Sequence, residues 1–259
     1  MFCYRHPDRE TGVSCQRCGR YICPQCQVPN AVGYLCPEDG RVPVATKLKN
    51  SNTPSLTIAL IAINALVYLG QLASQNVLTY LIEYQPSLTQ YMPWTLITAG
   101  FAHASIIHIG LNMYSLFLFG SVLEPLLGKL RFATLYLLSI LGGSVAVLFL
   151  APNTAVLGAS GGIFGLMGAY FVILRSLGQR SGQMTGLIAL NLIMGFLPGT
   201  NISWQAHVGG LVIGGLVAYV YSITRSSNDL AKQRGYLLAI TAGLAIAVFF
   251  GVSLLSRGL

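Results

Sequence analysis

The chain has 259 residues, of which 54% are hydrophobic and only 8% charged, whereas a soluble domain carries about 25% charged residues. This composition excludes an ordinary soluble domain and favours a membrane protein. The formal net charge is +8, but the basic residues form short clusters between apolar segments, which argues against a nucleic-acid partner. All six cysteines lie within the first 36 residues, so the chain is predicted to contain two modules.

Residues 1–40 contain four pairs of metal-binding residues, each pair with two residues between its members. Such a spacing lets one turn present two ligands to a tetrahedral zinc ion, and eight ligands make two sites. Forty residues cannot build an adequate hydrophobic core, so metal binding is expected to supply the folding free energy. The candidate ligands are Cys3 and His6, Cys15 and Cys18, Cys23 and Cys26, and Cys36 and Asp39.

The spacing of these pairs resembles that of B-box and RING-like cross-braced zinc modules. The resemblance implies that the first and third pairs share one structural zinc ion, and the second and fourth pairs another. Asp39 stands where such modules usually have Cys or His; the alternative is a surface aspartate beside a three-ligand or empty second site. Charged residues at positions 5–10 leave no room for an apolar signal segment, so the module is expected to be cytosolic, with reduced thiols. A disulfide framework is the alternative for the whole module.

Residues 41–54 have the composition of a linker, with little hydrophobic periodicity. Seven apolar segments follow, and most are long enough to cross a hydrocarbon core, which needs about 20 residues. The fifth is short and bounded by glycine and proline. The predicted fold class is an all-α polytopic membrane protein. The segments are 55–74, 104–123, 131–151, 158–177, 184–198, 204–223 and 234–255.

The Lys and Arg residues predict an orientation. They precede the first segment and lie at the turns after the second, fourth and sixth segments, and only Arg257 departs from this pattern. The positive-inside rule therefore predicts a multi-pass cell-membrane protein with seven spans and a cytosolic amino terminus. The outer connection 74–98 contains Tyr80, Tyr84, Tyr91 and Trp94. These aromatic residues favour short amphipathic helices on the bilayer surface over a plain solvated loop.

Polar groups inside apolar segments are costly and mark function by default, and four of them stand out in this sequence. His108 and Asn112 are four residues apart and share one face of the second segment. Ser160 begins the fourth segment and His207 the sixth. The predicted orientation places all four at a similar depth on the outer side. Ser160 lies in Gly158-Ala159-Ser160-Gly161-Gly162, which matches G-x-S-x-G but lacks the preceding strand of a soluble hydrolase.

The chemistry of these residues favours nucleophilic catalysis. A serine hydroxyl needs a base within hydrogen-bond reach, and His207 is the best-placed candidate for Ser160. The developing oxyanion needs fixed donors, for which the backbone N–H of Ser160 and the side chains of His108 and Asn112 are candidates. No third partner is found on the outer side, so the sequence predicts a Ser–His dyad opening to the outer face.

Two acidic residues are excluded as triad members, because Asp229 is predicted to be cytosolic and Glu124 lies at the inner end of the second segment. Glu124 is expected to pair with helix-end groups or with Lys129 or Arg131. Small residues on the fourth and sixth segments are expected to let Ser160 and His207 meet. These residues are Gly158, Gly161, Gly162, Gly165, Gly209, Gly210, Gly214 and Gly215.

The same residues resemble the rhomboid intramembrane serine proteases over residues 55–225. The shared motifs are Phe101-Ala102-His103, His108-x3-Asn112, Leu123-Glu124, Leu127-Gly128, Arg131-Phe132, Gly158-Ala159-Ser160-Gly161 and Ala206-His207-x-Gly209-Gly210. The resemblance implies a six-helix catalytic core at 55–225, an extra carboxyl-terminal helix at 226–259, and no catalytic cofactor. It further implies Ser160 as nucleophile, His207 as base, His108 and Asn112 as oxyanion contributors, and transmembrane segments of proteins as substrates. An aromatic ring at Phe164 is implied to pack on the catalytic histidine.

Each residue alone has a simpler explanation. Ser160 could be a helix N-cap, His207 a packed histidine, and Asn112 a residue that hydrogen-bonds between helices. Their common depth and family order favour the catalytic site. His103 is expected to be a hydrogen-bonded histidine that supports the loop. The alternative function is a non-catalytic rhomboid-like binder or scaffold. The zinc module's role stays open among binding a cytosolic partner, delivering substrates and setting the oligomeric state, and its spacing assigns no ligase activity.

Overall fold

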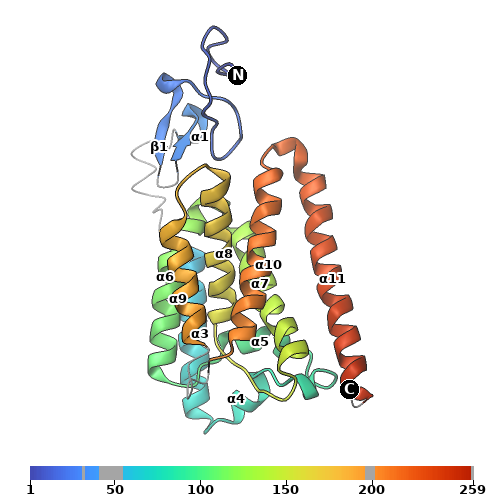
Figure 1. The fold of residues 1–259 in the computed structure, drawn as a ribbon. Helices are drawn as coiled ribbons and strands as arrows, with labels where there is room; N and C mark the ends of the chain where they lie inside the picture. The colour runs from blue at the N-terminus through green and yellow to red at the C-terminus, as the bar shows by residue number, and fades with distance from the viewer. Residues whose placement is uncertain (31–32, 41–54, 196–201, 258–259) are drawn as a thin grey trace. The chain divides into compact units, whose positions relative to one another are not determined.

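The computed structural model describes residues 1–30, 33–40, 55–195 and 202–257 of a mostly helical chain (Figure 1). Contacts divide the chain into two compact units. The amino-terminal unit contains Met1–Thr53 and Val220–Tyr236, and the membrane unit contains Pro54–Tyr219 and Leu237–Leu259. The predicted linker 41–54 lies outside the described residues, so the boundaries drawn from the sequence stay predictions.

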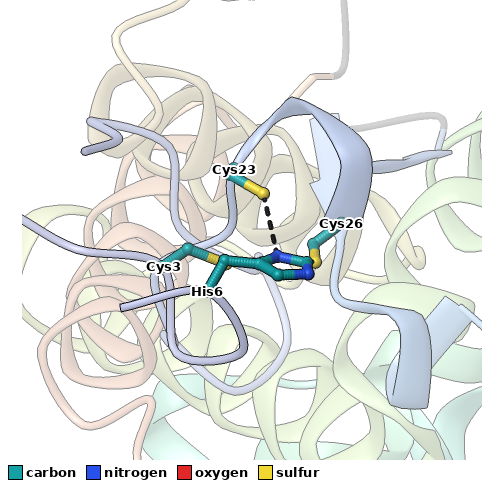
Figure 2. Close-up of side chains that lie close together, drawn as sticks. All are labelled: Cys3, His6, Cys23 and Cys26. Carbon is teal, nitrogen blue, oxygen red and sulfur yellow. Dashed lines mark hydrogen bonds between the residues drawn. The ribbon is translucent and has the colours of Figure 1, made fainter. Parts of the chain in front are cut away.

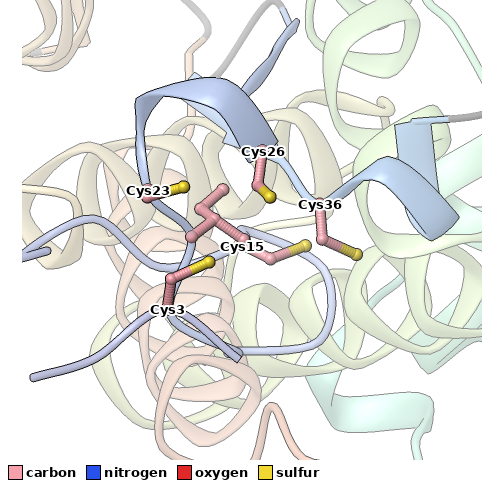
Figure 3. Packing of buried hydrophobic residues seen from close by; sticks show 6 residues of the cluster. Cys3, Cys15, Cys23, Cys26 and Cys36 are labelled. Atoms are coloured by element: carbon pink, nitrogen blue, oxygen red, sulfur yellow. The ribbon is translucent and has the colours of Figure 1, made fainter. Parts of the chain in front are cut away.

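Residues 1–40 form a loop-rich fold whose interior consists mainly of cysteines. Single antiparallel bridges join Phe2 with Glu10 and Ser14 with Tyr21. The buried cluster contains one aliphatic side chain, Ile22, and the thiols of Cys3, Cys15, Cys23, Cys26 and Cys36 (Figure 3). One aliphatic residue cannot offset the entropy of ordering such a segment. The elements are η1 (Pro24–Cys26), the antiparallel strands β1 (Val28–Asn30) and β2 (Gly33–Leu35), and α1 (Pro37–Gly40).

Seven helices form from the seven predicted apolar segments within the described residues. Five of them are long and apolar enough to cross a membrane: α3 (Ser55–Ala73), α6 (Ile106–Leu127), α7 (Lys129–Leu150), α10 (Trp204–Ile223) and α11 (Leu230–Ser256). Two are shorter apolar helices, α8 (Ser160–Ser176) and α9 (Gly182–Met194). The prediction of a polytopic membrane protein is confirmed, and five of the seven expected spans have the required length.

The connection between α3 and α6, residues 74–105, folds into short helices on the membrane unit. Tyr84, Leu96 and Ala99 of this connection are buried, while Tyr91 and Trp94 are exposed. The prediction of short helices is confirmed, while their amphipathic character and their place on a bilayer surface stay predictions. Its elements are α4 (Val77–Ile82), η2 (Pro86–Leu88), α5 (Thr95–Thr98) and η3 (Ala99–Phe101).

Glycines allow α8 to pack backbone to backbone against α10. A Cβ atom added at Gly210 would lie 2.0 Å from the carbonyl oxygen of Gly161, and one at Gly214 would lie 2.2 Å from that of Gly165. Real Cβ atoms do not approach so closely, so no larger residue fits without moving a helix. The expectation that small residues bring these segments together is confirmed at these positions. Gly215 has only ordinary contacts, at 3.7 and 3.9 Å.

Glu124 ties α6 to the first turn of α3. Its buried carboxylate accepts hydrogen bonds from the backbone N–H groups of Leu56 (2.9 Å) and Thr57 (2.7 Å) and from the Thr57 hydroxyl (2.7 Å). The first N–H groups of a helix lack intrahelical partners and lie at the positive end of its dipole, which favours a carboxylate there. The prediction of helix-end partners is confirmed, and the partner helix is α3.

Candidate functional site

Ser160 and His207 are brought together by the amino-terminal ends of two helices. Ser160 is the first residue of α8, and His207 lies in the first turn of α10. The Oγ atom of Ser160 lies 2.9 Å from Nε2 of His207, which is a hydrogen-bond distance. The close backbone packing of α8 on α10 through Gly161 and Gly210 lies directly beside both residues. The structure thus places the predicted dyad residues in contact.

The His207 ring is held by packing on one face and is free at its second nitrogen. Phe164, one turn after Ser160, stacks on it with ring centroids 4.0 Å apart and planes 13° from parallel. This is the aromatic contact that the family resemblance implies. The buried Nδ1 of His207 has no hydrogen-bond partner among the described residues. A neutral imidazole that accepts the Ser160 proton at Nε2 carries its own proton on Nδ1, and that tautomer would have to be held without a partner at Nδ1 among the described residues.

His108 lies against the loop that carries the serine. It sits in the first turn of α6, where its backbone N–H donates to the N-cap hydroxyl of Ser105 at 3.2 Å. A Cβ atom added at Gly158 would lie 2.8 Å from Nε2 of His108, and the φ of Gly158 is +129°. Only glycine fits this position, both for its backbone conformation and for its space. Nδ1 of His108 accepts from the backbone N–H of Ala104 (3.4 Å), which leaves Nε2 as the protonated nitrogen facing the loop.

Asn112 shares the His108 face of α6 and is buried. Its Nδ2 donates one hydrogen bond to the carbonyl oxygen of His108, at 2.8 Å. An amide nitrogen carries two hydrogens, so one donor of Asn112 is still available for a ligand. The structure therefore places Asn112 one turn below His108, on the same face.

His103 supports the site differently from the prediction. Its ring meets the His108 ring edge to face, with centroids 5.0 Å apart, and is buried. In the part of the chain that the structure describes, neither ring nitrogen has a hydrogen-bond partner. The bond runs instead through the backbone N–H of His103, which donates to Oε1 of Gln71 at 2.9 Å.

Gln71 is a residue that the sequence reasoning missed. From α3 it accepts from His103 and donates to the hydroxyl of Thr79 in α4, at 2.8 Å. The signal was present, because a glutamine inside the apolar segment 55–74 is a costly polar group.

The amino-terminal unit contains two candidate metal centres, and the described residues pair as the B-box and RING resemblance implies. The ligand atoms of Cys3, His6, Cys23 and Cys26 all lie within 4.8 Å of one another, as do those of Cys15, Cys18, Cys36 and Asp39. All six cysteines are free thiols, which contradicts the disulfide alternative in this structure.

The donor geometry fits a tetrahedral metal ion. Zinc–sulfur bonds of about 2.3 Å place neighbouring sulfur ligands about 3.8 Å apart. In the first centre, Nδ1 of His6 lies 3.3, 3.4 and 3.8 Å from the sulfur atoms of Cys23, Cys26 and Cys3 (Figure 2). In the second centre, Oδ2 of Asp39 lies 3.2 Å from the sulfurs of Cys15 and Cys36. Asp39 is therefore placed as a ligand would be, rather than as a detached surface residue.

Arg20 braces the second centre and was not singled out from the sequence. Its Nε donates to Sγ of Cys18 (3.1 Å) and its Nη2 to Sγ of Cys36 (3.4 Å). The same guanidinium pairs with Glu38 at 2.8 Å and lies over the Tyr4 ring, whose hydroxyl also donates to Glu38. The Tyr4 hydroxyl and then the Arg20 charge lower the pKa of Glu38. A set of thiolates and a carboxylate around a divalent ion carries net negative charge, which this cation offsets.

Burial acts on the thiols of this centre. Burial raises the pKa of the Cys36 thiol to about 12. The thiolate is the form that binds a metal, so metal binding here must displace protons.

Fold and site together define a multi-pass helical membrane protein in which a serine hydroxyl meets a histidine imidazole between apolar helices. Residues 90–224 match the family model of the rhomboid domain, and the chain belongs to the rhomboid family. Members of this family are typically intramembrane serine proteases. The matched residues include Ser160, His207, His108 and Asn112, and they leave the candidate metal centres outside.

Curated relatives are similar to parts of this chain. The chain is similar to the putative rhomboid protease YdcA of Bacillus subtilis (strain 168), with 38% identity over 49% of this chain and 66% of that protein. It is also 38% identical to the RHOMBOID-like protein 6, mitochondrial, of Arabidopsis thaliana, over 49% of this chain and 43% of that protein. The rhomboid protease GluP of Bacillus subtilis (strain 168) is 29% identical over 82% of this chain and 43% of its own length. The chain thus spans less than two thirds of these relatives.

Proposed function

We propose that this protein is an intramembrane serine endopeptidase that cleaves transmembrane segments of membrane proteins with a Ser160–His207 dyad. The observation that carries the proposal is the 2.9 Å distance between Oγ of Ser160 and Nε2 of His207 among apolar helices. A serine and a histidine at this distance are the minimum for a base-activated nucleophile. Membership of a family whose members are typically proteases supports the same reaction.

In the proposed mechanism, Nε2 of His207 takes the proton of Ser160 as Oγ attacks the carbonyl carbon of the scissile peptide. The negative oxygen of the tetrahedral intermediate is stabilised by the backbone N–H of Ser160, by Nε2–H of His108 and by the free amide hydrogen of Asn112. The protonated His207 then gives its proton to the leaving amine, and the C–N bond breaks. A water molecule, deprotonated by His207, hydrolyses the acyl-enzyme and restores the Ser160 hydroxyl.

The substrates and the orientation follow from where the dyad lies. Because the dyad lies between apolar helices, the polypeptides that can reach it are those inside the bilayer. We therefore propose membrane-protein segments as substrates. The Lys and Arg distribution supports a cytosolic amino terminus and a dyad that opens to the outer face. The core 55–225 would then comprise six spans and α11 a seventh. No metal enters the reaction.

A serine-directed fluorophosphonate probe tests this proposal on the full chain in detergent. We expect labelling of the wild type, no labelling of Ser160→Ala, and loss of labelling in His207→Ala, because the hydroxyl is unreactive without its base. Ser121→Ala is the matched control, since the Ser121 hydroxyl donates only to a carbonyl of its own helix. If the wild-type chain is folded and helical by circular dichroism but is not labelled, the result would favour the non-catalytic binder.

We further propose that residues 1–40 are a cytosolic zinc module with two structural ions. Their ligands would be Cys3, His6, Cys23 and Cys26 in one site and Cys15, Cys18, Cys36 and Asp39 in the other. Zinc would replace the hydrophobic core that this unit lacks. A cytosolic partner bound through this module is part of the proposal.

Metal analysis of the purified full chain is expected to find two zinc ions per chain, one for each ligand set. Asp39→Ala should lower the content toward one, because the second site loses a ligand, while the exposed Asp8 serves as the matched control in Asp8→Ala. Two retained ions in Asp39→Ala would show that Asp39 is not a ligand. A wild-type chain without zinc would refute both sites.

A further inference from the structure

A cluster of buried apolar side chains joins the 74–105 connection to the helices of the dyad. Its core is Tyr84, Leu96, Ala99 and Val147. Leu141, Ala151, Val156, Ala206 and Val248 pack against it. We call these residues the loop cluster. They come from the 74–105 connection, from α7 and the turn after it, and from α10 and α11, all within the membrane unit.

The loop cluster fixes the chain on the serine side of the dyad. Tyr84 and Val156 exchange two backbone hydrogen bonds, of 2.9 and 2.8 Å. The backbone N–H of Gly158 donates to the carbonyl oxygen of Ala99, at 2.9 Å. The connection is itself tied to α7, because the hydroxyl of Ser144 donates to the carbonyl oxygen of Leu96 at 2.8 Å. The approach of the chain to Ser160 therefore depends on the position of the 74–105 connection.

The same cluster reaches the histidine side. Ala206, which directly precedes His207, packs against it. One apolar cluster thus contacts residues close in the chain to both Ser160 and His207, whose hydrogen bond depends on accurate placement.

α11 contacts the loop cluster through Val248 and packs on α7 beside it. Leu244 is buried, Val248 packs on the cluster, and a Cβ atom at Gly251 would lie 2.5 Å from Cδ2 of Leu148 in α7. These residues are spaced by four and three positions, so they lie on one helix face. The adjacent Phe249 is exposed. The carboxyl-terminal end of α11 lies at the end of the membrane unit that carries α4 and α5 (Figure 1).

We propose that α11 is a positioning element of the active site. Val248 packs on the loop cluster and Gly251 lets α11 approach α7, so that together they hold the cluster against α7. The cluster in turn fixes Gly158 and Ala206, and thereby the distance between Ser160 and His207. Val248 and Gly251 touch no reacting group. This inference rests on the proposed protease function and assigns a catalytic consequence to a helix that the matched rhomboid domain, residues 90–224, does not include.

The test compares Val248→Ala with Phe249→Ala, an adjacent exposed residue of the same helix. We expect Val248→Ala to lower kcat and the rate of Ser160 labelling by fluorophosphonate about tenfold, because small displacements of a nucleophile from its base are costly. KM should change less than about twofold. The conservative variant Val248→Ile, which keeps a branched apolar side chain, should retain the wild-type rate. Gly251→Val, which crowds the side chains of Leu148 and Phe149 in α7, should act in the same direction. Phe249→Ala should behave as wild type.

A labelling rate for Val248→Ala equal to that of Phe249→Ala would overturn the inference while leaving the protease proposal intact. A fall in melting temperature without a change in the labelling rate of the folded chain would also overturn it, because α11 would then be merely structural. Failure of the wild type to react at all would instead count against the protease proposal itself.

Discussion

Ser160→Ala is expected to lower cleavage of a transmembrane substrate by at least about a thousandfold, because no acyl-enzyme can form without the hydroxyl. His207→Ala should cost about as much, since the pair acts as a unit and the double variant should be no worse than either single one. Purified chain in detergent or vesicles, with a substrate cut at one site, gives the rates. Circular dichroism establishes that each variant is folded.

Substitution of Asn112 measures how much oxyanion stabilisation contributes to the cleavage rate, separately from the nucleophile. Asn112→Ala should lower kcat by about a hundredfold, since one donor to the oxyanion is lost. Asn191→Ala is the matched control, because Asn191 in α9 is exposed and its amide donates to a carbonyl of its own helix at 2.8 Å. For the dyad itself, cleavage that survives in His207→Ala would show that the 2.9 Å contact between Ser160 and His207 does not activate the nucleophile.

Gly210→Ala is expected to damage both stability and catalysis. The new Cβ atom would lie 2.0 Å from the carbonyl oxygen of Gly161, so α8 and α10 must separate or tilt. Overpacking of this kind costs about 1–3 kcal/mol. The displacement occurs next to Ser160 and three residues after His207, so the cleavage rate should fall by about a hundredfold. Thermal unfolding in detergent and the cleavage assay provide the two measurements.

Gly215→Ala is the matched control for this effect. It lies on the same helix, but its Cβ atom would make only ordinary contacts, at 3.7 and 3.9 Å. We expect stability and cleavage close to those of the wild type. Equal behaviour of the two glycine variants would mean that the close contact between Gly210 and Gly161 does not maintain the dyad.

Local features of this chain can be predicted from its sequence, whereas contacts between distant residues need further information. The apolar segments were located because hydrophobicity over a stretch of residues is a property of that stretch. The candidate metal-ligand pairs are visible in the sequence because a two-residue spacing is set by one turn. The pairing of Ser160 with His207 needed more, since 46 residues lie between them, and came from their common predicted depth and from the family resemblance.

Other features were missed or only half predicted, because they depend on contacts between distant residues. The carboxylate of Glu124 was expected near a helix end, but its partners are at the start of α3. His103 was expected to form a hydrogen bond through its ring, but the bond is made by its backbone N–H and Gln71. Arg20 gave no signal beyond its charge, since its bond to Cys36, 16 residues away, exists only once the chain has folded.

The amino-acid sequence alone predicts that this chain crosses a membrane as helices, carries paired candidate metal ligands before them, and contains a serine and a histidine in the order of the rhomboid motifs. Those properties reside in composition and short spacings. Three contacts are visible only in the folded chain: Ser160 meets His207 at 2.9 Å, Asp39 lies among three thiols, and Val248 of α11 packs on the loop cluster. These contacts join residues far apart in the chain, so no local pattern predicts them. For Ser160 and His207, the distance also depends on how close Gly161 and Gly210 let α8 and α10 approach.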